Sequence, residues 1–427
     1  MSTENATQMG SGGETGPGSI DLLSDAAFQC PYPVYDRLRT EAPVHYDEKR
    51  GGYFITKMAD IRHVLNNPAV FSNEILDLVG MSPSLRRVTM PAPGLLFVDP
   101  PLHARSRSLV DRAFTAPRVN RMAGLIQSIL DGLFKEFIGL GRVDVFSQLA
   151  MPLPVDLIGR ELGVPLEGRD QFRRWGFALA NAFNPALTTG QRDDLVPMVE
   201  EVNAYMLAKR REKRAKPTED ILSVLSSACP KESITKEGDE KGSELSDGEF
   251  LTIVQQLVIA GTENTTAGIL SAIYELVRSP EMFARLRADP ALVGPFVEEI
   301  LRLESPGSGF IRLVKQDTEL GGVKIPKGSI VQLRYGAANR DPAQFECPAQ
   351  LDMGRRNASN HLAFGSGPHA CIGQMLARKE LVCTVRMVCT SMTSLSIDPD
   401  HAEPRYTHTF FLRCLDSLHL RFTVAAA

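Results

Sequence analysis

The chain has 427 residues, of which 43% are hydrophobic and 23% are charged, and its formal net charge is −4. This is the balance of a globular protein, and the small negative charge gives no indication of a nucleic-acid partner. The seven cysteines are odd in number and widely spaced, with no CxxC pair, which argues against a disulfide framework or a zinc ribbon. We therefore expect a protein of the reducing cytoplasm.

The beginning of the chain carries few residues that could build a core. Residues 1–20 are rich in Gly, Ser, Thr and Glu, and the first basic residue of the chain is Arg37. Such a composition predicts a disordered leader, because it cannot bury enough apolar surface to fold. No segment approaches the roughly 18 uninterrupted apolar residues of a membrane helix, so we expect no membrane anchor. Residues 21–427 are predicted to form a single domain.

The first half of the chain is predicted to contain helices, one short pair of strands and two loops. The strand-like segments VHYD and GYFIT are joined by a turn at Gly51 and Gly52. Apolar spacing of three and four residues predicts helices, whereas Pro, Gly and charged runs predict loops. The predicted helical ranges are 32–40, 58–66 and most of 102–227, and the predicted loops are 74–98 and 230–249.

The second half begins with a long predicted helix over residues 246–278, which Pro280 ends. Further helices are expected over 281–289 and 291–304. The segment GGVKIPKGSIVQLR predicts a hairpin around residues 326–328, and FFLRCLDSLHLRF predicts another pair of short strands near the C-terminus. The fold class predicted from these elements is mainly α with small β-sheets.

A segment rich in glycine, FGSGPHACIG, extends from Phe364 to Gly373 and precedes an apolar, helix-prone run. Cys371 could be a nucleophile, a buried structural cysteine or a metal ligand, but a core cysteine does not need glycines around it. Glycines allow the backbone to approach a flat group closely. A cysteine before a helix lies at the positive end of that helix, which favours the thiolate. Such a thiolate is a good axial ligand for iron, and its donation to haem iron promotes O–O cleavage.

The pattern of Phe364, Gly367, Cys371 and Gly373 resembles the haem-binding signature of the cytochrome P450 family. The resemblance covers about residues 30–425 and includes the phrases ANRDP and HLAFG. It implies the cytochrome P450 fold, with haem b between a long oxygen-activating helix and the helix that follows the cysteine ligand. It also implies that Cys371 binds the iron and that Phe364, Gly365 and Gly373 contact the cofactor. A nucleophilic role for Cys371 would need a matching His and Asp arrangement, which we do not find.

Two further groups of residues match the family in order and spacing. Glu299 and Arg302 in FVEEILRLESP resemble the family's ExxR element, whose third partner is an arginine before the cysteine. That partner is Arg355 or Arg356, and we take Arg355; an isolated surface ion pair is the alternative. The resemblance also implies a set of donors that hold the haem propionates, since buried carboxylates need such partners. This set consists of His103, Arg107, Arg312 and His369.

The segment QQLVIAGTENTTAGIL resembles the family's helix over the haem. The resemblance implies that Ala260 and Gly261 leave room for dioxygen and that Glu263 relays protons. Asn264 stands where the family usually has threonine, and Thr265 follows. Asparagine can donate and accept hydrogen bonds but is a poor proton carrier. Asn264 therefore orients water or an oxygen-bearing substrate, or a distortion brings Thr265 into the usual place, or Asn264 only caps a kink.

The resemblance also indicates where a substrate would bind. The candidate positions are mostly apolar, which predicts an apolar substrate. Phe183 and the two phenylalanines near the C-terminus could equally be core residues. The candidates are Leu95, Leu96, Phe97, Phe183, Ile259, Ala260, Phe310, Phe410 and Phe411.

The implied activity is that of a monooxygenase that uses O₂ and inserts one of its oxygen atoms into a C–H bond. Electrons would come from NAD(P)H through a ferredoxin reductase and a separate 2Fe–2S ferredoxin. Arg105, Arg112, Arg378 and Lys379 could form a basic docking site for that ferredoxin, or simply a solvated helix face. The alternatives are a peroxygenase, an oxidative coupling enzyme, or a non-catalytic haem-binding protein.

Overall fold

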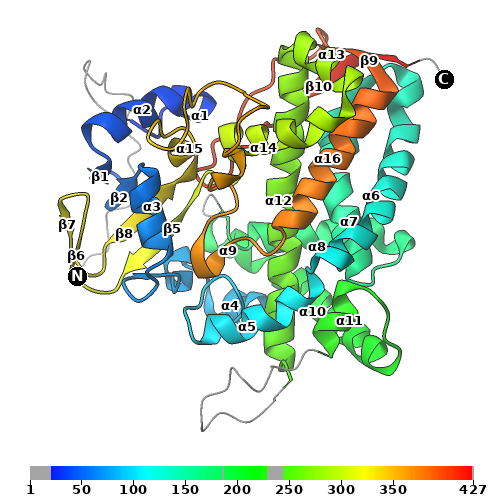
Figure 1. Cartoon of the computed structure of the whole chain (residues 1–427). Coiled ribbons are helices and arrows are strands. Elements are labelled where there is room, and N and C mark those ends of the chain that lie inside the picture. Colours follow the sequence, from blue (N-terminus) through cyan, green and yellow to red (C-terminus); the bar gives the residue numbers. More distant parts are fainter. Residues whose placement is uncertain (1–20, 185–186, 228–243, 426–427) are drawn as a thin grey trace.

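The computed structural model describes residues 21–184, 187–227 and 244–425 (Figure 1). The predicted leader over residues 1–20 and most of the predicted loop over 230–249 lie outside the described residues. Figure 1 shows a half that contains the larger sheet and a half built from helices, with the long helix α12 (Asp247–Arg278) crossing the helical half. Among the described residues, no helix is both long and apolar enough to cross a bilayer.

The helices agree with the mainly α prediction. Many begin at a serine, threonine or aspartate cap or with a proline in the first turn, as expected for exposed helix starts. The helices are α1 (Asp25–Gln29), α2 (Tyr32–Glu41), α3 (Met58–Leu65), α4 (Pro83–Thr89), α5 (Leu102–Val110), α6 (Ala116–Phe137), α7 (Pro152–Glu161), α8 (Arg169–Asn181), α9 (Thr189–Asp193), α10 (Val196–Ala215), α11 (Ile221–Ser226), α12 (Asp247–Arg278), α13 (Pro280–Ala288), α14 (Val293–Glu304), α15 (Tyr335–Ala338) and α16 (Gln374–Ser391).

The strands form small sheets. A five-stranded sheet has the order β1-β2-β8-β5-β3, a three-stranded sheet has the order β4-β10-β9, and β6 pairs with β7. The strands are β1 (Val44–Asp47), β2 (Gly52–Ile55), β3 (Phe71–Ser72), β4 (Arg142–Asp144), β5 (Gly309–Val314), β6 (Thr318–Leu320), β7 (Val323–Ile325), β8 (Ile330–Arg334), β9 (Met392–Ile397) and β10 (His419–Val424).

Helix α12 organises the core. It begins at Ser246, whose side chain and Glu249 form a reciprocal capping box, and it ends at Ser279 before Pro280. Its long buried stretches belong to the largest apolar cluster of the protein, which also includes residues of α6, α7, α14 and α16. Figure 1 shows α16 running beside α12 in this half. The helix predicted over 246–278 is therefore present, and residues 247–249 of the predicted loop belong to it.

Two strand predictions were wrong. The hairpin expected around residues 326–328 does not form, because β7 pairs with β6 across Gly321 and Gly322, whose φ angles are 56° and 80°. Two adjacent glycines with positive φ suit a tight hairpin turn better than a turn that contains proline. Strand β8 instead lies between β2 and β5, parallel to the first and antiparallel to the second. Near the C-terminus only β10 is a full strand, and Leu412 and Leu415 form isolated bridges.

The predicted loop over residues 74–98 contains a helix. Ser82 caps α4 by accepting a hydrogen bond from the Leu85 amide at 3.2 Å, and Pro83 occupies its first turn. The rest of this segment is fixed to α12. The Leu95 amide donates to Gln256 Oε1 at 2.7 Å, and Thr252 Oγ1 donates to the Ala92 carbonyl at 2.9 Å. These bonds hold the segment over a cavity beside α12.

Candidate functional site

A cavity of about 290 Å³ lies between α12, the segment before α16 and the end of the larger sheet. Side chains of α5, β5 and the segment before α5 complete its wall. Leu257, Ala260, Gly261, Asn264 and Thr265 line it with spacings of three and four residues, so they form one face of α12. The cavity therefore joins the residues of the predicted oxygen-activating helix to those of the cysteine segment.

The cysteine segment is held in place by glycines with positive φ. Gly365 and Gly367 have φ angles of 67° and 70°, a region that favours glycine. A Cβ atom on Gly367 would lie 2.4 Å from the Leu65 carbonyl oxygen, so the segment packs against the end of α3. The Cys371 amide then donates to the Phe364 carbonyl at 2.8 Å. This tight turn brings Cys371 and Phe364 to the cavity wall.

The electrostatics of Cys371 differ in part from the sequence prediction. The cysteine precedes Gly373, the N-cap of α16, by two residues, so it lies just outside the helix. Burial raises the pKa of the Cys371 thiol, and this outweighs the backbone hydrogen bond from Gly373 and the charges of Arg107 and Arg378, which lower the pKa. The predicted stabilisation of a thiolate by the helix start is therefore smaller than the cost of burial. A bound cation would be needed to make the thiolate the favoured form.

Four polar side chains predicted to hold propionates line one part of the cavity; we call His103, Arg107, Arg312 and His369 the donor cluster. The rings of His103 and His369 lie with their centroids 3.9 Å apart. Burial lowers the pKa of His103, and it lowers that of His369 to about 3, with the charges of its neighbours adding to the effect. Both imidazoles are therefore neutral near pH 7.

The two arginines of the donor cluster differ in their partners. Arg107 bonds Asp111 Oδ1 at 2.8 Å and the Ala370 carbonyl at 2.5 Å. Arg312 is 7% exposed, and its Nη1 donates to the carbonyl of its neighbour Ile311 at 2.8 Å. Among the described residues, no carboxylate forms an ion pair with Arg312, and His369 Nε2 is buried without a hydrogen-bond partner. Buried groups of this kind normally have partners, so a ligand that accepts hydrogen bonds fits here.

The arrangement fits a haem on two grounds. The donor cluster offers buried hydrogen-bond donors to two carboxylates, and Cys371 offers a sulfur ligand on the same cavity wall. The lining around Cys371 is apolar, with Leu376, Ala377 and Leu381 on the first turns of α16. Among the described residues, no cluster of three or more His, Cys, Asp or Glu side chains could hold a metal by themselves. A single thiol beside an apolar wall suits a metal that arrives inside a macrocycle.

Behind the cavity lies an ion-pair cluster of Glu299, Arg302 and Arg355. Arg302 bonds both oxygens of Glu299, at 2.7 and 2.9 Å, and neither side chain is exposed. Arg355 Nε lies 3.2 Å from Glu299 Oε1, whereas Arg356 is exposed, so the structure brings Arg355 to this carboxylate. The remaining donors of Arg302 bond backbone carbonyls, including that of Asn339 at 2.9 Å. Burial raises the pKa of Glu299, but the arginines and the Asp352 amide outweigh this effect. The pKa of Glu299 is therefore lower than usual.

Only some of the site residues predicted on α12 line the cavity. Ala260, Gly261, Asn264 and Thr265 line the cavity, and α12 is unbroken through them, so no distortion is needed to bring Thr265 to the wall. The Asn264 side chain lies beside Gly307, where a Cβ atom would be 3.3 Å from its Oδ1. Glu263 does not line the cavity, and part of its side chain is exposed. Partial desolvation by the surrounding protein nevertheless raises its pKa, and its charge raises the pKa of the Cys414 thiol.

The apolar candidates for substrate contact also divide into residues that line the cavity and residues that lie outside it. Leu95, Leu96, Phe97 and Phe310 line the cavity together with Ala260. The remaining four lie elsewhere among the described residues: Ile259 and Phe183 pack against the core, and Phe183 also stacks on Phe97 at 6.0 Å. The side chains outside the cavity are Phe183, Ile259, Phe410 and Phe411.

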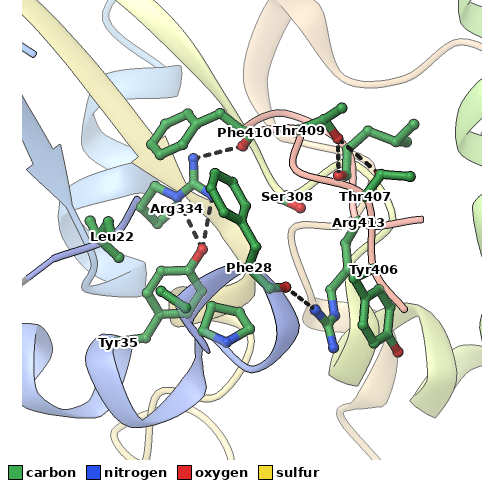
Figure 2. A pocket seen from close by; sticks show the side chains of 13 residues that line it. Leu22, Phe28, Tyr35, Ser308, Arg334, Tyr406, Thr407, Thr409, Phe410 and Arg413 are labelled. Atoms are coloured by element: carbon green, nitrogen blue, oxygen red, sulfur yellow. Dashed lines mark hydrogen bonds between the residues drawn. The ribbon is translucent and has the colours of Figure 1, made fainter. Parts of the chain in front are cut away.

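The prediction for Phe410 was wrong for an electrostatic reason. Its ring lies between two guanidinium groups, with Arg50 Cζ 3.7 Å and Arg334 Cζ 3.9 Å from the ring centroid. Figure 2 shows Arg334 beside Phe410, where it donates to the Phe410 carbonyl and to the Tyr35 hydroxyl. These contacts hold Phe410 in a separate, small pocket between the N-terminal helices and the C-terminal segment.

Several cavity residues were not predicted from the sequence. Ile158 of α7 and Leu257 of α12 extend the apolar wall, and Asn73 and Tyr335 add polar groups. Leu257 could have been found, since it precedes Ala260 by three residues on one helix face. Glu380 was also missed, although it interrupts the apolar stripe of α16 that faces the core. Ile158 and Tyr335 reach the cavity through tertiary packing and left no local signal.

The four basic residues predicted to dock a ferredoxin are not equivalent. Arg105 forms an ion pair with Glu249, and Arg378 bonds both oxygens of Glu298, at 2.7 and 2.8 Å. The Arg378 guanidinium also lies 4.4 Å from the centroid of the Phe364 ring. Arg112 and Lys379 are partly exposed. The free charge at this surface is therefore smaller than the sequence suggests.

Comparisons with known proteins agree on one family. The family model described as Cytochrome P450 matches residues 198–392. Cytochrome P450 107B1 of Saccharopolyspora erythraea is 33% identical over 94% of this chain and 98% of its own length. Vitamin D(3) 25-hydroxylase of Pseudonocardia autotrophica is 35% identical over 86% of this chain and 87% of its own. The structure of cytochrome P450 CYP109Q5 from Chondromyces apiculatus matches with a TM-score of 0.84 at 30% identity, covering 95% and 98% of the two chains.

These matches cover nearly the whole described fold, and they include proteins named as P450s and as a hydroxylase. The family consists of haem-containing oxidoreductases that act with O₂ and with electrons derived from NAD(P)H. The chain belongs to the cytochrome P450 family, and it is a P450 monooxygenase of the bacterial type.

Proposed function

We propose that this P450 inserts one oxygen atom of O₂ into a C–H bond of a small to medium apolar substrate. The observation that carries the proposal is the cavity itself, in which one thiol faces a wall of α12 and an apolar segment. Leu95, Leu96, Phe97 and Phe310 would cover the substrate. One relative is named Vitamin D(3) 25-hydroxylase, and the hydroxylation in its name is consistent with the proposed reaction.

The residues have separate tasks in this proposal. Haem b bound through Cys371 Sγ would supply the activation of O₂. The donor cluster would hold the haem carboxylates, since Arg312 and His369 Nε2 are buried and lack such partners among the described residues. The ion-pair cluster would keep the segment before Cys371 rigid. Ala260 and Gly261 have small side chains or none, and they would leave space beside α12 where oxygen binds.

The main experiment tests the ligand and the reaction together. Wild-type protein reduced under CO is expected to give the red-shifted Soret band of thiolate-bound haem, and Cys371→Ala is expected to abolish it. Reconstitution with a ferredoxin, its reductase, NADH and a set of terpenes, fatty acids and steroids is then expected to yield a hydroxylated product. Product with H₂O₂ but none with the ferredoxin system would identify a peroxygenase and refute the proposal.

Asn264 is proposed to orient water or an oxygen-bearing group of the substrate. It lines the cavity, and its amide can donate and accept hydrogen bonds. Separate Asn264→Ala and Thr265→Ala variants distinguish this role from that of Thr265. Asn264→Ala is expected to lower the product formed per NADH and to change the position of oxidation. If only Thr265→Ala lowers it, the role assigned to Asn264 is wrong.

Electrons are proposed to come from a separate 2Fe–2S ferredoxin that docks near Arg112 and Lys379. These two cations are partly exposed, whereas Arg105 and Arg378 already have carboxylate partners. The double variant Arg112→Glu with Lys379→Glu is expected to slow ferredoxin-dependent reduction and to weaken its salt dependence. Lys324→Glu, on the distant β6–β7 hairpin, is the matched control. Equal rates in both variants would exclude this docking site.

A further inference from the structure

The small pocket that holds Phe410 is separate from the cavity beside α12 and has a volume of about 30 Å³ (Figure 2). It lies where α1 and α2 meet the start of β5, the end of β8 and residues 406–413. A space of this size has room for about two water molecules. The described residues that line it include two arginines, Arg334 and Arg413, and no aspartate or glutamate.

The two arginines of the small pocket differ in their partners. Arg413 pairs with Glu304 at 2.9 Å, so its charge is compensated. Arg334 is 4% exposed and bonds only neutral acceptors, the Tyr35 hydroxyl at 2.8 and 3.2 Å and the Phe410 carbonyl at 3.0 Å. These bonds use three of its five N–H groups, so two remain free. Within the described part of the chain, the buried charge of Arg334 has no carboxylate partner.

Arg50 places a second cation against the same aromatic ring. Its guanidinium lies 3.7 Å from the centroid of Phe410, and its Nε is buried without a hydrogen-bond partner. Burial and then the charge of Arg334 lower the pKa of Arg50, and the more distant charges of Asp47 and Asp21 oppose this effect without forming an ion pair with it. Buried charges normally have charged or hydrogen-bonding partners, so these two arginines together favour an anion.

The small pocket also contains a free hydroxyl. Ser308 is 8% exposed and lines the pocket, and its Oγ has no hydrogen-bond partner in the described ranges. In the view of Figure 2, Ser308 lies between Arg334 and Arg413. The hydroxyls of Thr407 and Thr409, in contrast, already donate to backbone carbonyls. Ser308 therefore supplies an O–H group that a bound anion could accept.

We propose that the small pocket binds one small monovalent anion of about the size of chloride. The free N–H groups of Arg334 and the hydroxyl of Ser308 would donate to the anion, and Arg50 would add positive potential from across the Phe410 ring. The small volume favours a single ion over a phosphate or an organic acid. A water molecule in the same place would leave the charges of both arginines uncompensated.

A bound anion would also stabilise one wall of the larger cavity. Gly307 and Tyr335 line that cavity, and the next residue, Ser308, and the preceding residue, Arg334, line the small pocket. The Tyr335 amide donates to the Ser308 carbonyl at 2.9 Å, which joins the two segments. The anion would therefore hold the ends of β5 and β8 together from the side opposite the cavity.

The main test is the thermal unfolding of the haem-loaded protein as sodium chloride replaces sodium gluconate at constant ionic strength. Gluconate is too large for the pocket and keeps general screening unchanged. We expect the unfolding midpoint to rise with chloride and to saturate, with a gain of about 3 °C when chloride is at 100 times its dissociation constant. Broadening of the ³⁵Cl NMR line by the protein measures the binding directly. If neither effect is present, the pocket holds only water and the proposal is wrong.

Two variants and one control locate the chloride response. Ser308→Ala is expected to raise the half-saturating chloride concentration by about 10-fold, because it removes a hydrogen bond to a charged group. Ser226→Ala is the matched control: Ser226 is fully buried at the end of α11, its hydroxyl also lacks a partner, and it lies outside the pocket. Its half-saturating concentration should equal that of wild type.

Arg50→Gln provides a second measurement if Ser308→Ala folds poorly. Arg50 does not line the small pocket and acts on it through its charge, so this variant should also weaken the chloride response. The proposal is overturned if both variants respond to chloride as wild type does, or if the control loses the response to the same extent. The chloride response needs neither O₂ nor a ferredoxin, so it can be present even if the proposed oxidation is not.

Discussion

The ion-pair cluster and the donor cluster each bury an arginine. The first neutralises its charge with a carboxylate, and the second does not. Arg302 is fully buried and bonds Glu299 twice, and its other donors bond backbone carbonyls. Arg312 is almost as buried, and its guanidinium donates a hydrogen bond to the carbonyl of the preceding residue. The first arrangement is complete without a ligand. The second is not, which identifies it as the part of the protein that a bound anion would complete.

The difference predicts which substitutions damage the fold and which damage ligand retention. A satisfied buried pair contributes to stability only while both partners are present, since removing one leaves the other charged and unpaired. An unpaired buried cation costs free energy until its ligand binds. Variants of the ion-pair cluster should therefore unfold more easily, and variants of the donor cluster should lose haem more easily.

The largest effect is expected for Arg302→Leu. This change leaves Glu299 buried with only Arg355 and the Asp352 amide as partners. We expect the free energy of unfolding, measured by urea denaturation, to fall by about 3–5 kcal/mol. Arg356→Leu is the control, because this neighbouring arginine is exposed, and its effect should stay within about 0.5 kcal/mol. Similar values for the two variants would show that the cluster is not a stabilising unit.

The next effect is expected for Arg312→Gln, and it concerns the cofactor. Loss of a charged hydrogen bond is worth about 1.5–3 kcal/mol, so haem should dissociate about 10–100-fold faster. The rate can be followed as haem transfers to an acceptor protein. The midpoint of thermal unfolding should move less than in Arg302→Leu. An unchanged haem dissociation rate would remove Arg312 from the donor cluster.

The same contrast explains what the sequence could predict. Motifs of fixed spacing, such as Glu299 with Arg302 or His103 with Arg107, lie on one helix face, so their positions follow from helical geometry. Contacts between distant segments leave no such signal. Arg50 and Arg334 enclose Phe410 from different parts of the chain, so Phe410 lies outside the pocket in which the sequence predicted it.

Acidic residues show a second limit of prediction from the sequence. Glu263 was assigned to proton relay because it follows Gly261 in a familiar pattern, yet the structure leaves it exposed. Glu380 has no motif of its own. It lies on the buried stripe of α16 with Leu376 and Leu381, so a charged residue in an apolar stripe was the available signal. Its place at the cavity wall depends on how closely α16 packs on α12 at Gly268, which is a tertiary property.

An effect of similar size, with a defined pH dependence, is expected for Glu298→Gln. Burial raises the pKa of Glu298, but bonds from Arg378 and His361 outweigh it and lower the pKa to about 2. The ionised form therefore stabilises the fold above the unfolded pKa of about 4.5, and this contribution is lost as the pH falls from about 4.5 to about 2. Glu298→Gln should cost up to about 3 kcal/mol at pH 7.

The pH dependence provides the check. Unfolding of wild type and Glu298→Gln by urea should differ most above pH 5, and the two curves should approach each other below pH 4.5 and converge near pH 2. A constant difference at every pH would mean that the variant loses packing and not a charge. This result would show that the charge of Glu298 does not stabilise the fold, in contrast to the charges of the ion-pair cluster.

The smallest effect is expected where both charges are exposed. Arg121 of α6 bonds Glu219 at 3.0 Å, but their side chains are 55% and 82% exposed. Water solvates both charges in the folded and unfolded states, so Glu219→Gln should change the free energy of unfolding by less than about 1 kcal/mol. Added salt should erase even this difference, because exposed charges are screened. A loss that equals that of Arg302→Leu and resists salt would show that pairing, rather than burial, sets the strength of ionic contacts in this protein.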